Sequence, residues 1–275
     1  MTLSTIRNNP AKQKKVKTKK QKAIAATCAV AFWLLVWHVV SLCVGSELVL
    51  VSPVKVVQTL FTVIFDPDFL KTVWYSAARI LGGFFTALAL GTVLGWVASR
   101  FWVVETLLRP ITAVIKATPV ASFIILVLLW FSGKNLSVII SMLMVFPVIY
   151  MNVLEGIRSA DEELLEMAQV FRLSVGKKLL YIYLPAVAPF FVSACSVSLG
   201  LCWKSGIAAE VIGTPDGSIG AVFYQAKIFL QTSELLAWTV VVVAVSVAFE
   251  KLFMFLLRLV LKKLKMEDVL NGKRA

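Results

Sequence analysis

The chain has 275 residues, of which 59% are hydrophobic and only 16% are charged, and its mean hydropathy is +0.87. Soluble domains are about 45–50% apolar and about 25% charged, so the composition excludes an ordinary soluble protein and predicts an integral membrane protein. The net charge is +13, but eight of the 28 basic residues lie at or before Lys22 and six lie at or after Arg258. Basic groups that flank apolar segments are typical of cytoplasmic anchors, and we expect no nucleic-acid partner.

Six segments are apolar enough to cross the hydrocarbon core of a bilayer, which takes about 20 residues. They cover residues 23–46, 72–99, 117–133, 135–154, 179–203 and 235–257. The predicted fold is therefore all-α, a polytopic membrane protein with six transmembrane helices in the lipid bilayer. The first segment is too long for a typical signal peptide and ends in a poor cleavage site, which favours an uncleaved span. Pro119 and Pro147 lie inside the third and fourth spans, and we expect each to kink its helix.

The distribution of Lys and Arg predicts the orientation of these spans. With the N-terminus placed inside, the cytoplasmic segments hold 20 basic residues and the outer segments hold five. Because cytoplasmic loops carry the excess of Lys and Arg, both termini are predicted to be cytoplasmic. The expected parts are a basic tail over residues 1–22, a six-helix transmembrane domain over 23–257 with a long cytoplasmic loop at 155–185, and a second tail over 258–275.

Two local patterns lie near the second span. Ser52 followed by Pro53 is a helix start signal, which predicts a short interfacial helix that ends before residue 66. Ala87, Gly91 and Gly95 recur every four residues within the span. Small residues at this spacing let transmembrane helices approach closely, so the pattern predicts a packing surface.

The cytoplasmic loop at 155–185 is polar and predicts two short helices. Ser159 and Glu162 have the spacing of a capping box, and the carboxylates that follow favour a helix N-terminus. We expect an amphipathic helix over 160–171, with Leu164, Ala168 and Phe171 on one apolar face, and a second helix over 174–183. A helix lying on the membrane surface is the alternative, but four carboxylates and no Lys or Arg in the first helix fit an anionic leaflet poorly.

The chain offers few groups for catalysis or metal binding. All four cysteines lie in apolar segments without CxxC spacing, and there is a single histidine, His38. Neither Gly133-Lys134 nor Gly176-Lys177 belongs to a complete phosphate-binding loop. We therefore expect no catalytic residue, metal site or cofactor on this chain.

Three charged residues lie in or beside the spans: Arg79 in the second, and Lys204 and Glu210 near the outer end of the fifth. Charges within a membrane usually face protein or a water-filled cavity. A structural pair between Arg79 and Glu210 is one interpretation, and a role in lining a translocation path is the other.

Several motifs together resemble a known family of membrane proteins. They are Glu155-Gly156-Ile157, Glu166 with Ala168, Leu184-Pro185, and Ala209-Glu210 through Gly213 followed by Gly217 through Gly220. Their order and spacing are similar to those of ABC-importer permeases of the nitrate, sulfonate, taurine and bicarbonate branch. The resemblance implies the permease fold of that family in a bacterial inner membrane. It also implies three partners: ATPase subunits that bind ATP and Mg, an extracytoplasmic solute-binding protein, and a second permease copy, which we expect to be identical.

The resemblance also assigns the loop at 155–185 to docking of the ATPase. The residues expected to couple to it are Asp161, Glu162, Leu164, Glu166, Ala168, Phe171 and Arg172. Arg172 departs from the family, which usually has glycine there to end the helix in a left-handed conformation. The helix is therefore expected to continue further or to break at Ser174.

The substrate stays open at this point. An importer of this class for a thiamine precursor or another heterocycle is as admissible as one for an oxyanion or sulfonate. A channel that works without an ATPase, or a membrane enzyme, is the alternative from another class. The chain has no histidine cluster, paired intramembrane carboxylates or filter-like repeat to support it.

Overall fold

Helices form every regular element in residues 19–264, the part of the chain that the computed structural model describes. The chain divides into two compact units, Met1–Lys55 and Val56–Ala275. The first unit holds α1 (Lys19–Val44), the helix of the expected first span. Most of the two predicted basic tails lies outside the described residues.

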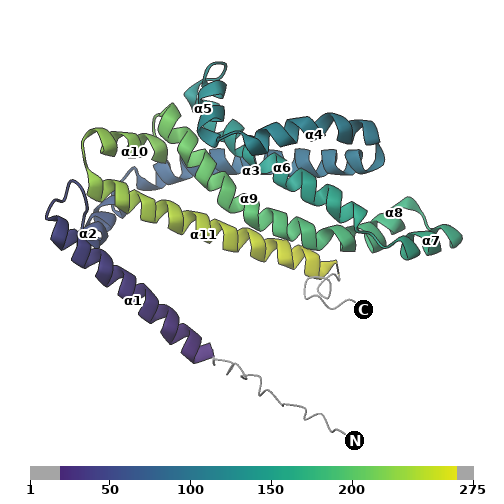
Figure 1. Ribbon diagram of the computed structural model, residues 1–275, viewed down its shortest axis with the longest axis horizontal. Helices are drawn as coiled ribbons and strands as arrows, with labels where there is room; N and C mark the ends of the chain where they lie inside the picture. The colour runs from purple at the N-terminus through teal and green to yellow at the C-terminus, as the bar shows by residue number, and fades with distance from the viewer. Residues whose placement is uncertain (1–18, 265–275) are drawn as a thin grey trace, which may run out of the picture. The chain divides into compact units, whose positions relative to one another are not determined.

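The second unit is a bundle of long and short helices (Figure 1). The predicted interfacial helix is present as α2 (Pro53–Ile64), which crosses the boundary between the units, and Pro53 is its first residue. The other elements are α3 (Phe69–Arg100), α4 (Trp102–Ala117), α5 (Val120–Leu128), α6 (Gly133–Arg158), α7 (Glu162–Val170), α8 (Val175–Lys178), the π-helix η1 (Leu179–Tyr183), α9 (Leu184–Gly213), α10 (Ile219–Ile228) and α11 (Thr232–Lys263).

The core of the bundle forms where α3, α6 and α9 meet, and the predicted small-residue surface lies at its centre. Ala87 is fully buried. A Cβ added to Gly91 would lie 2.9 Å from Ile149 Cβ, and one added to Gly95 would lie 3.0 Å from Val153 Cβ, both on α6. The glycines therefore bring the backbone of α3 against α6, as the spacing predicts.

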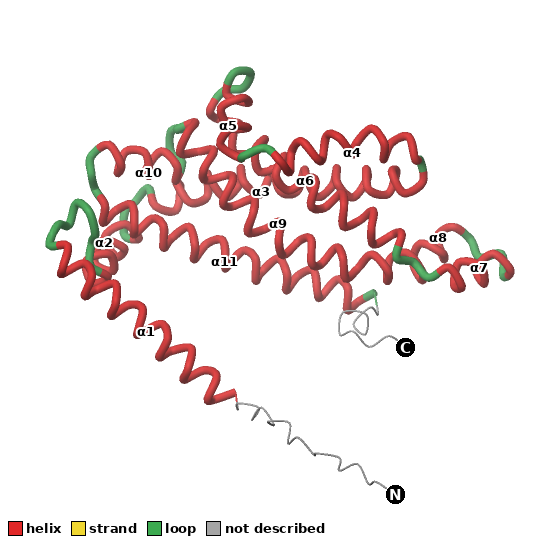
Figure 2. Tube along the Cα trace, in the orientation of Figure 1, coloured by secondary structure: helices red, strands yellow, loops and turns green. Residues whose placement is uncertain are grey.

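The third predicted span, residues 117–133, is not a single helix, because the kink expected at Pro119 is a complete break between two helices. Five helices in the described residues are long and apolar enough to cross a membrane, and a sixth span exists only if α4 and α5 count together. These two are bent by 106° around Pro119, and Figure 2 shows the short loop that joins them. Thr118 and Pro119 are both extended, because proline disfavours a helical conformation in the residue before it.

Two other prolines do not end their helices. Pro147 lies inside α6, which continues to Arg158, so any kink there is too small to interrupt the element. The second helix of the loop does not end at residue 183, ahead of Pro185, as expected. It runs as one helical segment from Val175 to Gly213, with the wider π-helical turn of η1 placed just ahead of the proline, where the α-helical hydrogen-bond ladder loses a donor.

The contact between α3 and α6 gives a test with a matched control on α3. Replacing Gly91 with Ala should destabilise the bundle by about 1–3 kcal/mol, because the added methyl group overpacks against Ile149. Gly82, which has no atom within 4 Å of an added Cβ, should tolerate alanine or gain up to about 1 kcal/mol from helix propensity. Thermal unfolding in detergent micelles measures both. Equal stability of the two variants would show that α3 and α6 do not meet at Gly91.

Candidate functional site

The acidic helix of the long loop is α7, and Asp161 begins it. Its side chain accepts a hydrogen bond from Glu163 N at 2.9 Å, whereas the Ser159 hydroxyl donates to Gly156 O at 2.9 Å. The predicted capping box at Ser159 is therefore wrong, because Ser159 ends α6 instead of starting α7. Glu162 and Glu163 lie in the first turn, where the partial positive charge of the helix N-terminus favours carboxylates.

Ala168 does not belong to an exposed face of α7, which corrects the predicted stripe. The residue is fully buried, in a small cluster with Ala160 and Ile182. Leu165 and Leu173 pack against this cluster, so one side of α7 is held against its own chain. The sequence could have indicated this, because Leu165 and Ala168 are three residues apart and therefore share one side of the helix.

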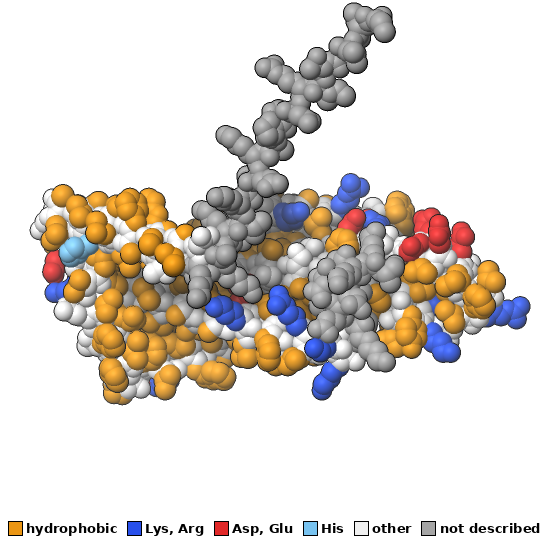
Figure 3. Space-filling view, turned by 90° about the horizontal axis from the view of Figure 1, so that it is seen from below, with side chains coloured by type: hydrophobic (Ala, Val, Ile, Leu, Met, Phe, Trp, Pro, Cys, Tyr) orange, Lys and Arg blue, Asp and Glu red, His pale blue; other side chains and the backbone are white. Residues whose placement is uncertain are grey.

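The opposite side of α7 is apolar and exposed. Phe171 is 71% exposed and Val170 is 79% exposed. We define the α7 surface as Leu164, Met167, Val170, Phe171 and Val175, all of them exposed. Leu164 and Phe171 were expected there, whereas the other three were missed. Figure 3 shows acidic side chains gathered beside hydrophobic ones at this end of the bundle, and the carboxylate of Glu166 is also exposed.

Arg172 takes the conformation that glycine has at this position in the family. Its φ is +49°, so the backbone is left-handed although the residue carries a side chain. Arg172 N donates to Gln169 O at 3.0 Å and Leu173 N donates to Ala168 O at 2.9 Å, the two hydrogen bonds of a Schellman motif. The helix therefore ends at Val170. It does not continue further or end at Ser174, as the sequence had predicted.

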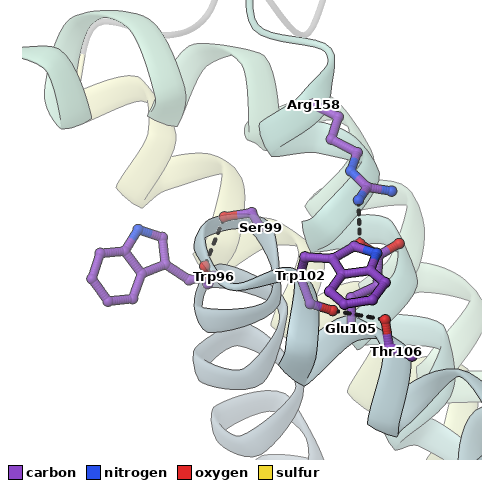
Figure 4. Close-up of polar contacts among 6 residues, drawn as sticks. All are labelled: Trp96, Ser99, Trp102, Glu105, Thr106 and Arg158. Atoms are coloured by element: carbon purple, nitrogen blue, oxygen red, sulfur yellow. Dashed lines mark hydrogen bonds and ion pairs between the residues drawn. The ribbon is translucent and has the colours of Figure 1, made fainter.

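An ion pair joins α4 to the base of the loop. Arg158, the last residue of α6, contacts the carboxylate of Glu105 in the first turn of α4 (Figure 4). The same view shows Thr106 Oγ1, which donates to Trp102 O at 2.9 Å.

Near the end of α6, Gly156 brings this helix against α9, because an added Cβ would lie 2.9 Å from Val187 Cα. The glycine of the Glu155-Gly156 motif is thus explained by helix packing.

Glu210 occupies a buried position at the other end of the bundle. The residue is fully buried, and its carboxylate accepts hydrogen bonds from Ser76 Oγ at 2.6 Å and from Gly220 N at 3.4 Å. Ser76 Oγ in turn accepts from Ile219 N at 2.9 Å. The carboxylate therefore holds α3, α9 and the N-terminus of α10 together, where the helix dipole favours a negative charge.

Gly220 lies against Glu210 so closely that an added Cβ would contact the Glu210 backbone. The two parts of the family motif, one around Glu210 and one ending at Gly220, thus meet at one contact. Because these hydrogen bonds connect three helices to one another, Glu210 has a structural role among the described residues.

The other two candidate path residues make no direct hydrogen bond or ion pair to Glu210 within residues 19–264. The guanidinium of Arg79 lies 4.5 Å above the ring of Tyr75, and Lys204 is exposed. Within residues 19–264, no ion pair of 4.0 Å or less joins Arg79 to Glu210. The structural pair between these residues and a shared role in a path therefore both stay predictions.

Comparisons with known proteins agree with these motifs. The profile of the family described as binding-protein-dependent transport system inner membrane component matches residues 87–266. A Bacillus subtilis (strain 168) protein named for aliphatic sulfonates transport, the permease SsuC, is 29% identical over 216 residues, which are 78% of each chain. The taurine transport system permease protein TauC of Escherichia coli (strain K12) is 27% identical over 220 residues, 78% of this chain and 80% of that protein.

A third relative is named for another substrate. The nitrate import permease protein NrtB of Synechocystis sp. is 25% identical over 214 residues, 74% of this chain and 76% of that protein. The matches to all three proteins include most of the chain and not only the loop.

The strained backbone at Arg172 predicts how the loop responds to substitution. Replacing Arg172 with Gly should stabilise the end of α7 by about 1 kcal/mol, because glycine adopts a positive φ without steric cost. Alanine carries the same Cβ as arginine and is the matched control, with little expected change. Hydrogen exchange of the amides of residues 171–173 measures the local opening, which should become about fivefold rarer only in the glycine variant. Equal exchange in all three proteins would contradict the left-handed conformation.

Proposed function

Since the chain belongs to the family of binding-protein-dependent transport system inner membrane components, with a match over residues 87–266, we propose how its surfaces serve transport. The protein is a multi-pass permease subunit of an ABC importer and is not the catalytic subunit. ATP and Mg would be bound by a separate ATPase chain. The permease would act as a pair of identical copies, with a translocation path between them.

The α7 surface is the proposed docking site for the ATPase. Five apolar side chains are exposed on and just after a short helix whose first turn carries carboxylates. An exposed apolar patch of this kind indicates a protein partner, and acidic groups beside it disfavour an anionic leaflet as the alternative. Because Ala168 anchors α7 to its own chain through Ile182, force applied to the α7 surface would reach η1 and α9 directly.

The coupling roles divide between the two sides of the helix. Leu164 and Phe171 would contact the ATPase, together with the exposed carboxylates of Glu162 and Glu166. Asp161 would act by capping α7, since its carboxylate accepts from Glu163 N. Ala168 and Arg172 would act by holding the shape of the loop. This division replaces the expectation that Ala168 shares the apolar face that meets the ATPase.

The proposed substrate is a small oxyanion or sulfonate that a solute-binding protein delivers to the outer face. The support is the set of relatives, which are named for aliphatic sulfonates, taurine and nitrate. A heterocycle importer of the same class would be recognised in an uptake assay with labelled solutes. No described residue distinguishes these substrates, because in such importers the binding protein is expected to select the solute.

A pair of phenylalanines tests the docking site. Phe171 and Phe229 are 71% and 70% exposed, and each is the C-cap of a short helix with a left-handed residue after it. Replacing Phe171 with Asp should weaken ATPase binding at least about thirtyfold, since buried aromatic anchors dominate interfaces. The matched Phe229→Asp variant should retain it. Co-purification of the ATPase subunit from membranes measures both outcomes.

If Phe171→Asp retained the ATPase at the stoichiometry of the unmodified protein, α7 would not be the docking surface. Loss in both variants would indicate a general folding defect, and the thermal stability of the isolated permease separates that case.

The proposed orientation has its own test. Both termini and α7 would be cytoplasmic, and the turn after α9 would face outward, as the 20 basic residues of the inner segments and the five of the outer segments predict. In a variant whose four cysteines are replaced, an impermeant thiol reagent should label Asp216→Cys but not Glu163→Cys in intact spheroplasts. Both positions are exposed on the protein surface, so a difference in burial would not explain a difference in labelling. Labelling of residue 163 from outside would reverse the orientation and exclude a cytoplasmic ATPase at α7.

A further inference from the structure

A cavity with both charged and apolar walls opens between α9 and α11, away from α7 and from the Glu210 network. Its volume is about 360 Å³, and its lining includes Ser196 on α9 and Glu250, Lys251 and Arg258 on α11. Val247 and Phe255 contribute apolar surface to the same cavity. Charged groups are rare within transmembrane helices because they are costly in hydrocarbon, so three of them around one cavity call for a ligand or for water.

The charges of the cavity do not cancel. Glu250 Oε1 accepts a hydrogen bond from Ser196 Oγ at 3.0 Å, which partly satisfies the carboxylate within the protein. Neither Lys251 nor Arg258 has a carboxylate within 4.0 Å among residues 19–264, and both are exposed. Since they are seven residues apart, they lie on one side of α11, about 10 Å apart along its axis. The cavity therefore carries a net positive charge suited to an anion.

The depth of the cavity places it near one surface of the bilayer. Glu250 lies 18 residues after Thr232, the first residue of α11, a distance of about 27 Å along the helix. The hydrocarbon core is about 30 Å thick, so the cations lie close to its far boundary. Lys and Arg at such a position can extend their head groups to the phosphate level.

The surface around the cavity is apolar. Leu252 and Leu256 are 55% and 51% exposed on α11, and both lie between Lys251 and Arg258 in sequence. Figure 3, which looks onto the side of the bundle where α11 lies, shows Lys and Arg side chains among mostly hydrophobic ones. A path for a hydrated solute would need polar walls, whereas cations bordered by exposed leucine match a phospholipid with its phosphate and acyl chains.

We propose that this cavity binds one anionic phospholipid from the leaflet on the α7 side of the membrane. Its phosphate would lie between Lys251 and Arg258, and an acyl chain would pack over Val247 and Phe255. The lipid would thereby fill the space between α9 and α11. The proposal requires that the chain spans a membrane, but it does not depend on where the ATPase docks.

The test measures lipid binding by the purified full chain in detergent. Native mass spectrometry with added phosphatidylglycerol or phosphatidylcholine counts bound lipids and gives apparent affinities. Phosphatidylglycerol should bind more tightly, and Lys251→Gln and Arg258→Gln should each weaken it about fivefold, the contribution of one cation near a membrane surface. Lys263→Gln is the control, an exposed cation on the same helix that does not line the cavity. It should leave the affinity nearly unchanged.

Two further arms distinguish a lipid from a free anion. Inorganic phosphate or nitrate, added without lipid, should not protect the chain against thermal unfolding, whereas phosphatidylglycerol should. Protection by either free anion that is lost in Lys251→Gln would overturn the proposal and make the cavity a solute site. Equal affinities for phosphatidylglycerol in Lys251→Gln, Arg258→Gln and Lys263→Gln would also overturn it. Both cavity variants should still co-purify with the ATPase, so a failure here is separable from a failure of the docking proposal.

Discussion

Backbone contact between helices is the constraint on which the bundle depends. In a bilayer, apolar side chains gain little by leaving lipid for one another, so helices are held by close packing and by hydrogen bonds between them. Gly91 and Gly95 bring α3 against α6, and Gly156 does the same between α6 and α9 near the long loop. Glu210 adds the hydrogen bonds that join α3, α9 and α10 at the far end. These contacts decide where α7 and the cavity lie.

The sequence predicted the parts of the fold that depend on hydropathy and on local backbone chemistry. Five long apolar runs formed helices that include most of their expected residues, and Pro53 began the short helix that its position indicated. The third apolar run was wrongly predicted to be one span, because hydropathy does not show in which direction the chain runs. The break at Pro119 turns the chain by 106°, and the apolar residues on either side give no sign of the angle.

The long loop shows the same limit at a finer scale. An amphipathic pattern shows which residues share a face, but not whether that face meets water or its own chain. Ala168 was assigned to the exposed face, yet it packs against Ile182, a residue 14 positions later in the sequence. Arg172 was expected to move the end of the helix. The hydrogen bond from Leu173 to Ala168 outweighs the small steric cost of a left-handed arginine, so the end stayed where glycine would have put it.

The uninterrupted segment from Val175 to Gly213 has a mechanical consequence. Its 39 residues make a rod about 58 Å long, which begins at Val175 of the exposed α7 surface and ends three residues beyond Glu210. Because the segment is helical throughout its length, such a rod would move mainly by tilting. A tilt of about 5° shifts one end of a rod this long by about 5 Å relative to the other, roughly the rise of one helical turn. A small movement of α8 would therefore tilt the whole segment, and the tilt would displace α10 at the opposite surface of the membrane.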